Sequence, residues 1–367
     1  MTPADAKLLY QSHILKLRVS PDAPISAPLL LGLLSTPIVR KQIRAKQFTA
    51  DIIDTIGNRY QELVLPVPKD PAERARTTQV VEEIVEQRGV LRERVRRIPL
   101  WVEGIIGSPD EALPVEEDEA FELGGNVGFL RRLRDLRAAI FVPRYYNPVL
   151  EQELQALATT HELVSLSELV ERDVLAFSTG IEVGKMAYST GPVPFIRTSD
   201  ISNWELKADP KQSVSEDLYE ATKRKLDVRS GDIFVVRDGT YLVGASAIVT
   251  AYDPKLLYAG GLYKIRTKKP QELDPYLLLA LLNTPVVRRQ MRAKQFTRDI
   301  IDTLGRRIFE VLIPIPKDGA MRRQITDVTR ETVETRARLR NDAKQLPLDL
   351  EGGQEAAEEE RELIEAL

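Results

Sequence analysis

A stretch of 42 residues occurs twice in this chain and decides its fold. Residues 29–70 read LLLGLLSTPIVRKQIRAKQFTADIIDTIGNRYQELVLPVPKD, and residues 277–318 read LLLALLNTPVVRRQMRAKQFTRDIIDTLGRRIFEVLIPIPKD, with 28 of the 42 positions identical. Pro37 matches Pro285, and this offset of 285 − 37 = 248 holds without a gap from Leu8 to Pro99. A solenoid needs three or more units at periods of ~20–50 residues, so two distant copies instead predict pseudo-two-fold symmetry within one chain.

The composition excludes several kinds of chemistry. With 367 residues, of which 43% are hydrophobic and 29% charged, we expect a soluble globular protein of roughly two or three domains. Cysteine is absent, which excludes disulfides, thiolate metal sites and a cysteine nucleophile. His161 has no second histidine four residues later, so it does not belong to a zinc-protease helix, and we expect an ordinary surface residue. The first residues lack the features of a signal peptide and no apolar run approaches ~18 residues, so we expect a cytoplasmic protein without a membrane span.

The charge is unevenly placed along the chain. The formal net charge of −3 does not by itself indicate nucleic-acid binding. Residues 110–122 and 351–367 are strongly acidic, however, and removing them leaves a basic remainder. Local patches are therefore a better guide to binding than the net charge.

Each copy of the repeat is expected to combine helices with short extended segments. Residues 8–19 and their match at 256–267 have the pattern of short strand pairs, and a helix is predicted from about 29 to 47. The DIIDTIG segment at 51–57 predicts a second short helix that Gly57 caps, followed by an extended ELVLPVPKD segment.

Basic residues gather at the end of the first predicted helix. They either complement the helix dipole or contact phosphate. The second copy retains and extends the cluster, which leaves both interpretations open. The residues are Arg40, Lys41, Arg44 and Lys46 in the first copy, and Arg288, Arg289, Arg292, Lys294 and Arg298 in the second.

Each copy then continues into a long helix with heptad spacing, from about 72 to 97 in the first copy. An arginine stands in the middle of each seam, so we expect the two weak seams to pack antiparallel on one another. Pro99 and Pro347 are expected to end the helices. The seam positions are Thr77, Val81, Ile84, Arg88, Leu91, Val95 and Ile98, and in the second copy Ile325, Thr329, Thr332, Arg336, Leu339, Ala343 and Leu346.

The middle of the chain occurs once. Residues 103–128 read as an acidic loop, and 129–139 as a short basic helix whose arginines pair with that acidic stretch. From residue 140 an α+β block follows, with a helix at 214–228 that Ser215 caps. Asp238-Gly239 between two apolar runs predicts a hairpin turn.

Three segments of this block and one that runs into the second copy of the repeat, together with the helical regions, resemble the specificity subunit of type I restriction–modification systems. The helical-region segments are the short helix before IPIPKD and the long helix after it. Together the segments span most of the chain, and their order and spacing are more specific than any one of them. The recognition-domain segments are VPRYYNP at 142–148, GPVPFIRTSDISN at 191–203, GDIFVVRDGTYLVG at 231–244 and DPYLLLALLNTP at 274–285.

The resemblance implies a DNA-reading adaptor that is not itself an enzyme. In that family two target recognition domains sit at opposite ends of two antiparallel helices, and each reads one half of a split site in double-stranded DNA. Methylation and cleavage belong to partners, which implies DNA adenine methyltransferase (modification) subunits and a restriction/translocase subunit. A helix of ~25 residues spans ~37 Å, close to one turn of B-DNA at ~34–36 Å, so the helices are expected to measure the gap between half-sites.

The chain departs from the family pattern in its first recognition domain. Residues 1–28 match only the final strands of the second domain, which begins near 140. Because 140 − 248 = −108, roughly a hundred residues that the symmetry calls for are absent. We expect that a separate chain supplies the missing half-domain, that the gene is truncated, or that the protein pairs with a copy of itself.

The predicted fold class is α+β, with an α/β target recognition domain that contains a small mixed sheet and two long helices packed as an antiparallel coiled coil. The predicted segments are a remnant of a first recognition domain at 1–28, a first helical spacer at 29–100, an acidic linker with a short basic helix at 101–139, a target recognition domain at 140–275, a second helical spacer at 276–347 and an acidic tail at 348–367.

No catalytic constellation or metal site is found, and no cofactor is expected. An amino-methyltransferase would need an Asn/Asp-Pro-Pro-aromatic site, which Asn147-Pro148-Val149 does not provide. Glu182 and Lys185 have the wrong spacing for a nuclease core, and the phosphate loop GxxxxGK[ST] is absent.

The candidate DNA contacts are polar residues near the ends of predicted elements. Arginine can bind guanine bidentately, and asparagine can bind adenine. Each candidate could instead form a salt bridge or cap a turn, and we expect Asp200 to cap the turn at Ser202-Asn203. The candidates are Arg144, Tyr145, Lys185, Tyr188, Arg197, Thr198, Ser199, Asn203, Arg237, Asp238, Thr240, Tyr241, Arg292 and Lys294.

The predicted function is therefore sequence-specific DNA recognition that directs a partner methyltransferase or restriction complex to its site. The alternative is a non-catalytic scaffold that docks methyltransferase subunits through the helical repeats without reading sequence.

Overall fold

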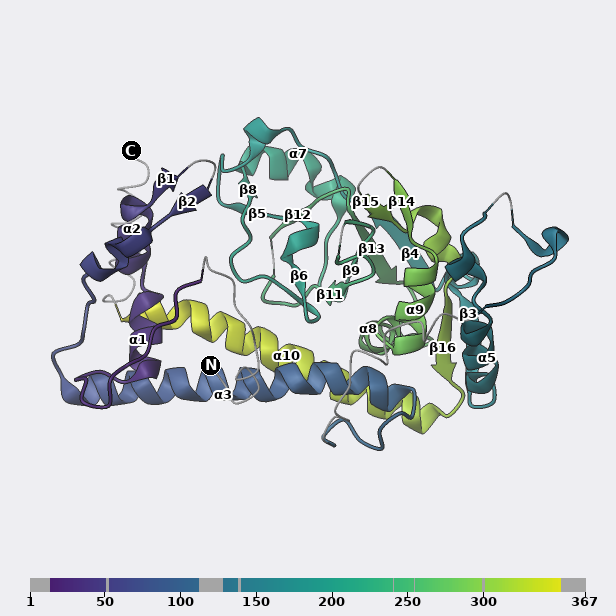
Figure 1. Ribbon diagram of the computed structural model, residues 1–367, viewed down its shortest axis with the longest axis horizontal. Helices are drawn as coiled ribbons and strands as arrows, with labels where there is room; N and C mark the ends of the chain where they lie inside the picture. The colour runs from purple at the N-terminus through teal and green to yellow at the C-terminus, as the bar shows by residue number, and fades with distance from the viewer. Residues whose placement is uncertain are drawn as a thin grey trace. The chain divides into compact units, whose positions relative to one another are not determined.

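The computed structural model describes residues 14–50, 53–111, 128–137, 140–239, 241–253, 255–298 and 301–350. The chain divides into two units, one formed by Met1–Leu91 with Arg338–Leu367 and the other by Arg92–Ala337. Figure 1 labels the helices and strands of both units. Within the described ranges, every helix is too short or too polar to cross a membrane.

The two copies of the repeat form the same elements at the same offset. The first copy contains α1 (Ala27–Leu34), α2 (Pro37–Lys46), β1 (Phe48–Ala50), β2 (Ile53–Thr55), the 3-10 helix η2 (Gly57–Glu62) and α3 (Pro71–Val102). The second copy contains α8 (Pro275–Leu282), α9 (Pro285–Ala293), β14 (Phe296–Arg298), β15 (Ile301–Thr303), η7 (Gly305–Glu310), β16 (Leu312–Pro316) and α10 (Gly319–Asp349). The two copies therefore fold into matching sets of elements, as the repeat predicts.

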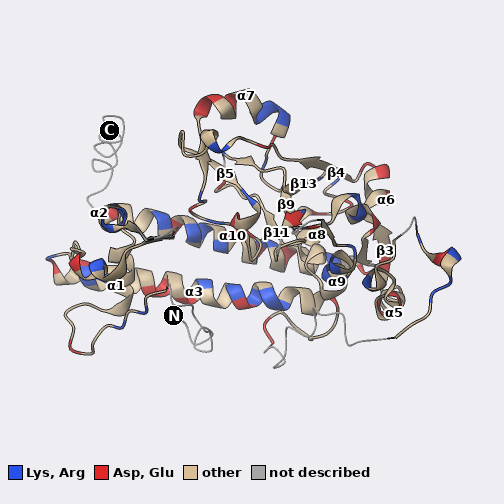
Figure 2. Cartoon of the chain, turned by 45° about the horizontal axis from the view of Figure 1, so that its top comes forward, with Lys and Arg blue, Asp and Glu red and all other residues tan. Residues whose placement is uncertain are grey.

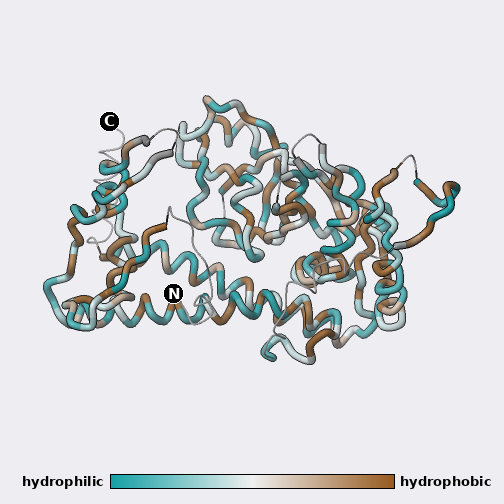
Figure 3. The backbone as a smooth tube through the Cα atoms, viewed as in Figure 1, coloured by the Kyte–Doolittle hydropathy of each residue, from teal (hydrophilic) through white to brown (hydrophobic). Residues whose placement is uncertain are grey.

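The single helix predicted over 29–47 is wrong, because two helices occupy this region. Thr36 is extended and serves as the N-cap of α2, with Pro37 as the first helical residue. Proline favours this position because its missing N–H is not needed there, and it disfavours helix in the residue before it. Both α1 and its counterpart α8 are strongly apolar (Figure 3).

The short helix predicted over 51–57 is also wrong. Phe48–Ala50 and Ile53–Thr55 form an antiparallel hairpin, in which Phe48 pairs with Thr55. Aromatic and β-branched residues favour strands, and here they form one. Gly57 adopts φ +52 and opens the following 3-10 helix instead of capping an α-helix. Gly305 repeats this conformation at φ +48.

The two copies also share their internal hydrogen bonds. The Gln42 side chain donates to Val64 O over 2.8 Å and accepts from Val64 N over 2.9 Å, and Gln290 makes the same two bonds with Leu312 at 2.7 Å each. A glutamine on the second helix therefore clamps the extended segment in each copy. That segment is the strand β16 in the second copy, whereas residues 63–68 form no strand.

The long helices run through the prolines that were expected to end them. Helix α3 has 32 residues with Pro99 inside, and α10 has 31 residues with Pro347 inside. Each is longer than the ~25 residues of the predicted ruler, so the expected span of ~37 Å is too short. Beyond Pro99 the last turn holds because Leu100, Trp101 and Val102 are buried in the core, and this packing outweighs the lost hydrogen bond.

Most of the predicted heptad seam is buried. In the first unit, Ile84 and Leu91 pack with Leu339 in one hydrophobic cluster, to which Val80 and Leu346 add. Val81 of α3 and Leu350, just after α10, both lie next to Gly32, while Leu339, earlier in α10, packs with Ile84 and Leu91. The two helical segments in this unit therefore run antiparallel. Of the predicted seam positions, Ala343 is exposed.

The second unit contains the block that occurs once. Its helices are α5 (Pro148–Leu157), α6 (Leu166–Glu171) and α7 (Glu216–Leu226), with 3-10 turns η3 (Leu133–Asp135), η4 (Pro143–Tyr146), η5 (Lys185–Ala187) and η6 (Thr198–Asp200). Its strands are β3 (His161–Ser165), β4 (Leu175–Thr179), β5 (Val193–Ile196), β6 (Ile201–Ser202), β7 (Glu205–Leu206), β8 (Ser213–Val214), β9 (Ile233–Val236), β10 (Asp238–Gly239), β11 (Ser246–Ile248), β12 (Leu257–Tyr258) and β13 (Leu262–Thr267).

The strands form several small sheets. The central one is antiparallel in the order β11-β9-β13-β4. A second sheet, β12-β5-β8, is mixed, because β12 pairs parallel with β5 and β8 pairs antiparallel. The predicted helix at 214–228 is confirmed as α7, where the Ser215 hydroxyl accepts from Leu218 N. Its first turn is acidic and its last turn is basic, which complements the helix dipole (Figure 2).

Two strand pairings attach this block to the second copy of the repeat. Strand β10 extends the β14–β15 hairpin by pairing with β15, and β3 pairs antiparallel with β16 over His161–Ser165. In the first copy, β1 and β2 form a sheet of only two described strands, and the segment matching β16 pairs with no described strand. The two copies therefore differ in their strand pairing: strands of the block pair with the second copy, and no described strand of the block pairs with the first.

Three further local predictions are wrong. Residues 14–20 form no strand, and their match at 256–267 forms β12 and β13, which lie in different sheets; residues 8–13 lie outside the described part of the chain. The segment 129–139 contains only the 3-10 turn η3 among its described residues. Asp238-Gly239 is strand β10 rather than a turn, because it pairs with β15.

The core lies mainly in the second unit. One cluster joins α8, α9 and the strand β16 to the central sheet, with Trp101, Leu166 and Ile233 among its buried members. A second cluster fills the space around β5, β9 and β12, with Phe195, Phe234 and Tyr258 buried. Strand β9 is therefore packed on both faces, and β5 packs into the second cluster.

Candidate nucleic-acid interface

Three of the predicted DNA-contact residues, Thr198, Arg237 and Asp238, meet at one turn of the second unit. The carbonyl of Gly261 accepts hydrogen bonds from Arg237 N at 2.9 Å and Asp238 N at 3.3 Å. On its other side, a Cβ at Gly261 would lie 3.0 Å from the Thr198 methyl group. Glycine thus allows the loop after β5 and the loop after β9 to approach each other closely.

The loop after β5 is held by Asp200 and presents Arg197. The buried Asp200 carboxylate accepts from Arg197 N at 3.0 Å, so it caps the turn that precedes it and not the expected turn at Ser202-Asn203. The Arg197 guanidinium is exposed and lies 5.8 Å from the centre of the Tyr188 ring. Ser199 and Lys185 are exposed beside them in the chain. The backbone is fixed while the polar side chains remain accessible.

Arg237 and Asp238 form a pair that joins the block to the second copy. Arg237 donates to Asp238 Oδ2 at 2.6 Å, and Asp238 Oδ1 accepts from the Thr303 hydroxyl at 2.5 Å. Beyond them the loop returns to β11 through Tyr241, whose side chain is 92% exposed. Thr240 lies outside the described residues. The ion pair with Asp238 therefore orients the Arg237 side chain, and Tyr241 lies at the accessible end of the loop.

Asn203 lies away from this group. It has φ +47, Trp204 has φ +69, and the two residues connect β6 to β7. Trp204 is buried and forms a bridge with Ala247 of the central sheet. Asparagine tolerates the left-handed conformation better than most residues, so the turn itself accounts for this side chain.

Arg144, Tyr145 and Lys294 form an anchor inside the unit. The Tyr145 hydroxyl donates to Glu310, the Lys294 ammonium lies 4.5 Å from the Tyr145 ring centre and 3.2 Å from Glu310 Oε2, and Arg144 donates to the Gln295 carbonyl. Burial, together with the bond to the Glu310 carboxylate, raises the pKa of Tyr145 to about 12. These three candidates hold η4 against α9 and η7, whereas the candidate Arg292 on α9 is exposed.

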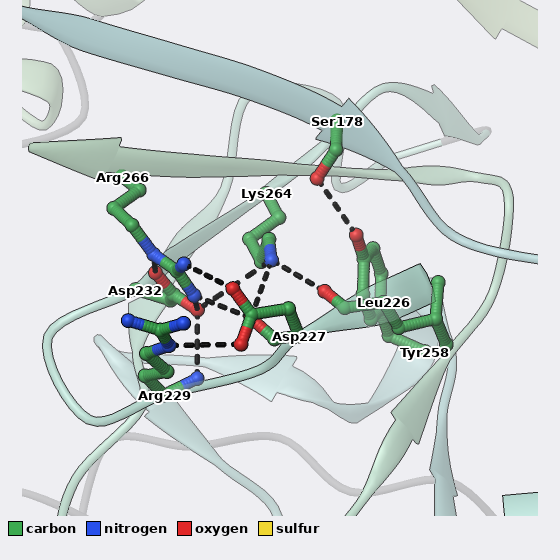
Figure 4. Close-up of polar contacts among 8 residues, drawn as sticks. All are labelled: Ser178, Leu226, Asp227, Arg229, Asp232, Tyr258, Lys264 and Arg266. Atoms are coloured by element: carbon green, nitrogen blue, oxygen red, sulfur yellow. Dashed lines mark hydrogen bonds and ion pairs between the residues drawn. The ribbon is translucent and has the colours of Figure 1, made fainter. Parts of the chain in front are cut away.

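Other basic residues of the block are used internally. Figure 4 shows that Lys264 and Arg266 of β13 point toward Asp227 at the end of α7 and Asp232 just before β9. Arg266 bonds Asp232 Oδ1 and Asp227 Oδ2 at 2.6 Å each, and Lys264 bonds the Asp227 carbonyl at 2.7 Å. Hydrogen bonds from Arg229 and Arg266 lower the pKa of Asp227 to about 2. This network fastens α7 to the central sheet.

Three of the four arginines of 129–139 find partners, though the acidic residues 112–122 expected to pair with them lie outside the described residues. Arg131 binds Glu151 at 2.5 Å, Arg137 lies 3.5 Å from Glu310 and Arg134 lies 3.8 Å from Asp135. The part of the chain that the structure describes contains no cluster of three His, Cys, Asp or Glu side chains able to hold a metal ion.

Sequence reasoning missed Glu310 and Arg307. Arg307 stacks 3.9 Å from the Phe296 ring centre and donates to the Lys294 carbonyl at 2.8 Å. Their counterparts in the first copy, Glu62 and Arg59, make equivalent contacts with Lys46 and Phe48. Identity of both residues between the two copies was the available signal.

Comparisons with known proteins returned solved structures only, since neither a protein-family model nor a curated protein matches the chain. The S subunit of a type I restriction–modification system from M. genitalium is 13% identical, covers 88% of this chain and 70% of its own, and has a TM-score of 0.39. A structure described by the assembly and conformational transition of the type I R-M system is 16% identical, with 89% and 71% coverage and a TM-score of 0.32. The HsdS subunit from Thermoanaerobacter tengcongensis is 16% identical, with 88% and 69% coverage and a TM-score of 0.30. All three come from type I restriction–modification systems, the class whose specificity subunit the sequence motifs resemble.

Proposed function

We propose that the chain is a DNA-recognition subunit that directs a partner DNA methyltransferase to its target site. The observation that carries the proposal is the meeting of Thr198, Arg237 and Asp238 at Gly261, on segments that follow the buried strands β5 and β9 and place the exposed Arg197 next to Thr198 in the chain. Direct readout of base edges needs polar side chains held on a rigid support, and this arrangement supplies both.

The residues of this group have different roles in the proposal. Arg197 is exposed and reads a base edge, with guanine as the expected target because its O6 and N7 accept both guanidinium donors. Arg237 is already paired with Asp238, so it orients the loop and contributes less to discrimination. Tyr241 contacts the duplex through its exposed ring.

The first copy of the repeat has an open face that fits a second recognition-type domain from a separate polypeptide. Leu31 is 48% exposed and Val67 is 37% exposed, whereas their counterparts Leu279 and Ile315 are 0% and 7% exposed. Lys46 and Glu62 keep the ion pair that, in the second copy, holds Tyr145. The surface therefore retains the partners of an arginine–tyrosine anchor and of a β3-type strand.

A synthetic peptide with the sequence of residues 140–165 tests this face, because it carries both the anchor and the strand. The full chain should bind it, Glu62→Ala should weaken binding at least tenfold, and Glu310→Ala should leave that site intact. Binding that ignores Glu62→Ala, or the absence of binding at millimolar peptide, would contradict a docking role for the first copy.

Selection from a random duplex library tests the main proposal. The full chain is mixed with its partner methyltransferase, bound duplexes are sequenced, and we expect one enriched site. No enrichment, with the complex still assembled, would instead support the scaffold alternative. Chemistry in this proposal belongs to the partner subunits, and no residue of this chain is assigned a catalytic role.

A further inference from the structure

Arg288 on α9 is a cation without a described counter-charge. Among the described residues its side chain has no ion pair or hydrogen bond, and its Nη1 atom is buried. Its neighbour Arg289 lies 2.9 Å from Glu153, and Arg336 lies 2.6 Å from Glu205. Lys294 and Arg266 also bind carboxylates in the same unit. A buried charge is ordinarily paired, because leaving it unpaired costs free energy.

The position of Arg288 is set by the loop that carries Tyr241. A Cβ at Gly244 would lie 2.7 Å from Arg288 Nη1 and 2.8 Å from the Met291 sulfur, so the guanidinium packs directly against the loop backbone. Gly244 has φ +80, a conformation that also favours glycine. The loop is fastened on both sides, since Gly244 N donates to Val236 O at 2.8 Å and Gln295 donates to Val243 O.

A second arginine adjoins the first. Arg292 is one helical turn further along α9, on the same face, and its side chain is exposed. Burial and the charge of Arg292 lower the pKa of Arg288 to about 10, which still leaves the guanidinium charged at neutral pH. Two positive groups thus adjoin each other on α9, Arg288 packs against the loop that carries Tyr241, and no described carboxylate neutralises Arg288.

We propose that Arg288 and Arg292 form a phosphate-binding site, which takes a phosphodiester of the DNA backbone when the Tyr241 loop is seated on the duplex. The inference rests on the proposed function and adds a positioning contact to it. Arginine suits this ligand because its planar fork donates two parallel hydrogen bonds to phosphate. A phosphate contact fixes register without reading sequence.

Stability distinguishes this role from a structural one. A structural arginine destabilises the fold when it is removed, because its partner is left unpaired. Arg288 leaves no described partner behind, so Arg288→Met should keep or raise the melting temperature of the free chain. A residue that costs stability and serves binding is the expected pattern for a functional site.

The test uses the full chain with Arg288→Met, Arg288→Lys and a control, Arg224→Met, which removes an exposed arginine of α7. Binding to a 30-base-pair duplex is measured across salt concentrations, and the melting temperature is measured with and without inorganic phosphate. Arg288→Met should weaken duplex binding roughly tenfold and reduce the salt slope by about 1. Inorganic phosphate should raise the melting temperature of the control as it does for the wild type, and this rise should be smaller in Arg288→Met. Arg288→Lys should show an intermediate rise.

The outcomes separate this site from the proposed function. If the wild-type chain binds no duplex but Arg288→Met still loses its phosphate response, the site stands and the proposed function fails. An unchanged salt slope with an unchanged phosphate response in Arg288→Met would overturn the site. A melting temperature for Arg288→Met more than a few degrees below that of Arg224→Met would do the same, because it would show a structural role.

Discussion

Glu103 is expected to make the second unit less stable as the pH rises toward neutrality. It follows the last residue of α3, and its Oε1 accepts from Val286 N at 2.5 Å in the first turn of α9. Burial raises the pKa of Glu103 to about 7 from an ordinary 4.5, although the Val286 hydrogen bond and the Arg289 charge act in the opposite direction. The Thr284 hydroxyl and the Glu153 carboxylate also face it.

The sign and size follow from proton linkage. Between pH 4.5 and pH 7 the folded chain keeps a proton that the unfolded chain has released, so its stability falls as the pH rises and is constant above that range. At about 1.36 kcal/mol for each pH unit, the free energy of unfolding should fall by about 3 kcal/mol. Glu103→Gln removes the titrating group and keeps the carbonyl oxygen that accepts from Val286 N. It should match the wild type at pH 4.5 and exceed it by up to about 3 kcal/mol at pH 8.

Urea denaturation followed by tryptophan fluorescence from pH 4.5 to pH 8 measures this difference, because Trp101 and Trp204 are both buried in the second unit. Burial also lowers the pKa of His161, but that contribution is common to both proteins and cancels in the comparison. Glu111→Gln is the control, since this exposed carboxylate likewise accepts from a backbone N–H, that of Gly107. The reasoning is refuted if Glu103→Gln shows the same pH dependence as the wild type.

Three further substitutions test the geometry of the second unit. Tyr145→Phe keeps the ring but loses the hydrogen bond to Glu310, and should lower the free energy of unfolding by about 1.5–3 kcal/mol in urea; an unchanged midpoint would remove Tyr145 from the anchor. Arg336→Met leaves Glu205 buried without its 2.6 Å partner and should cost about 3–5 kcal/mol, whereas adding Glu205→Met should restore most of it; equal losses in single and double variants would argue against a coupled pair. A Cβ at Gly180 would lie 2.2 Å from Tyr258 O, so Gly180→Ala should cost about 1–3 kcal/mol while Gly184→Ala, with open space around it, stays neutral, and similar melting temperatures would contradict the close packing.

The correspondence of elements between the two copies was predictable from the repeat, and so was the long helix of each copy, whereas the hairpin at residues 48–55 was not. The 42-residue identity fixed which residues of the two copies correspond, and every element of the second copy except β16 has its counterpart at that offset. Local pattern misjudged residues 51–57 and Pro99, because strand pairing in the first case and core packing in the second decide the conformation. Phe48 pairs with Thr55 across a hairpin, and buried Trp101 keeps α3 helical beyond Pro99.

The candidate site was predictable only as a list of polar residues near strand ends. That Thr198 and Arg237 meet depends on Gly261, which comes after both in the chain and contacts each of them. That Tyr145 meets Lys294 depends on a contact between residues about 150 positions apart, which no local pattern can show. In the sequence, Arg288 is one of several basic residues in a cluster. Only the structure shows that its buried Nη1 atom has no described hydrogen-bond partner.

The most direct test of the central claim compares the sequence preference of two variants in the assembled methyltransferase complex. Duplex selection is repeated with Arg197→Ala, which changes the proposed base contact, and with Arg292→Ala, which changes a proposed phosphate contact. The account predicts that Arg197→Ala relaxes one position of the enriched site, and that Arg292→Ala keeps the site but weakens all sequences and flattens the salt slope by about 1. An unchanged preference at every position in Arg197→Ala would contradict the claim that this chain reads DNA through the loops at Gly261.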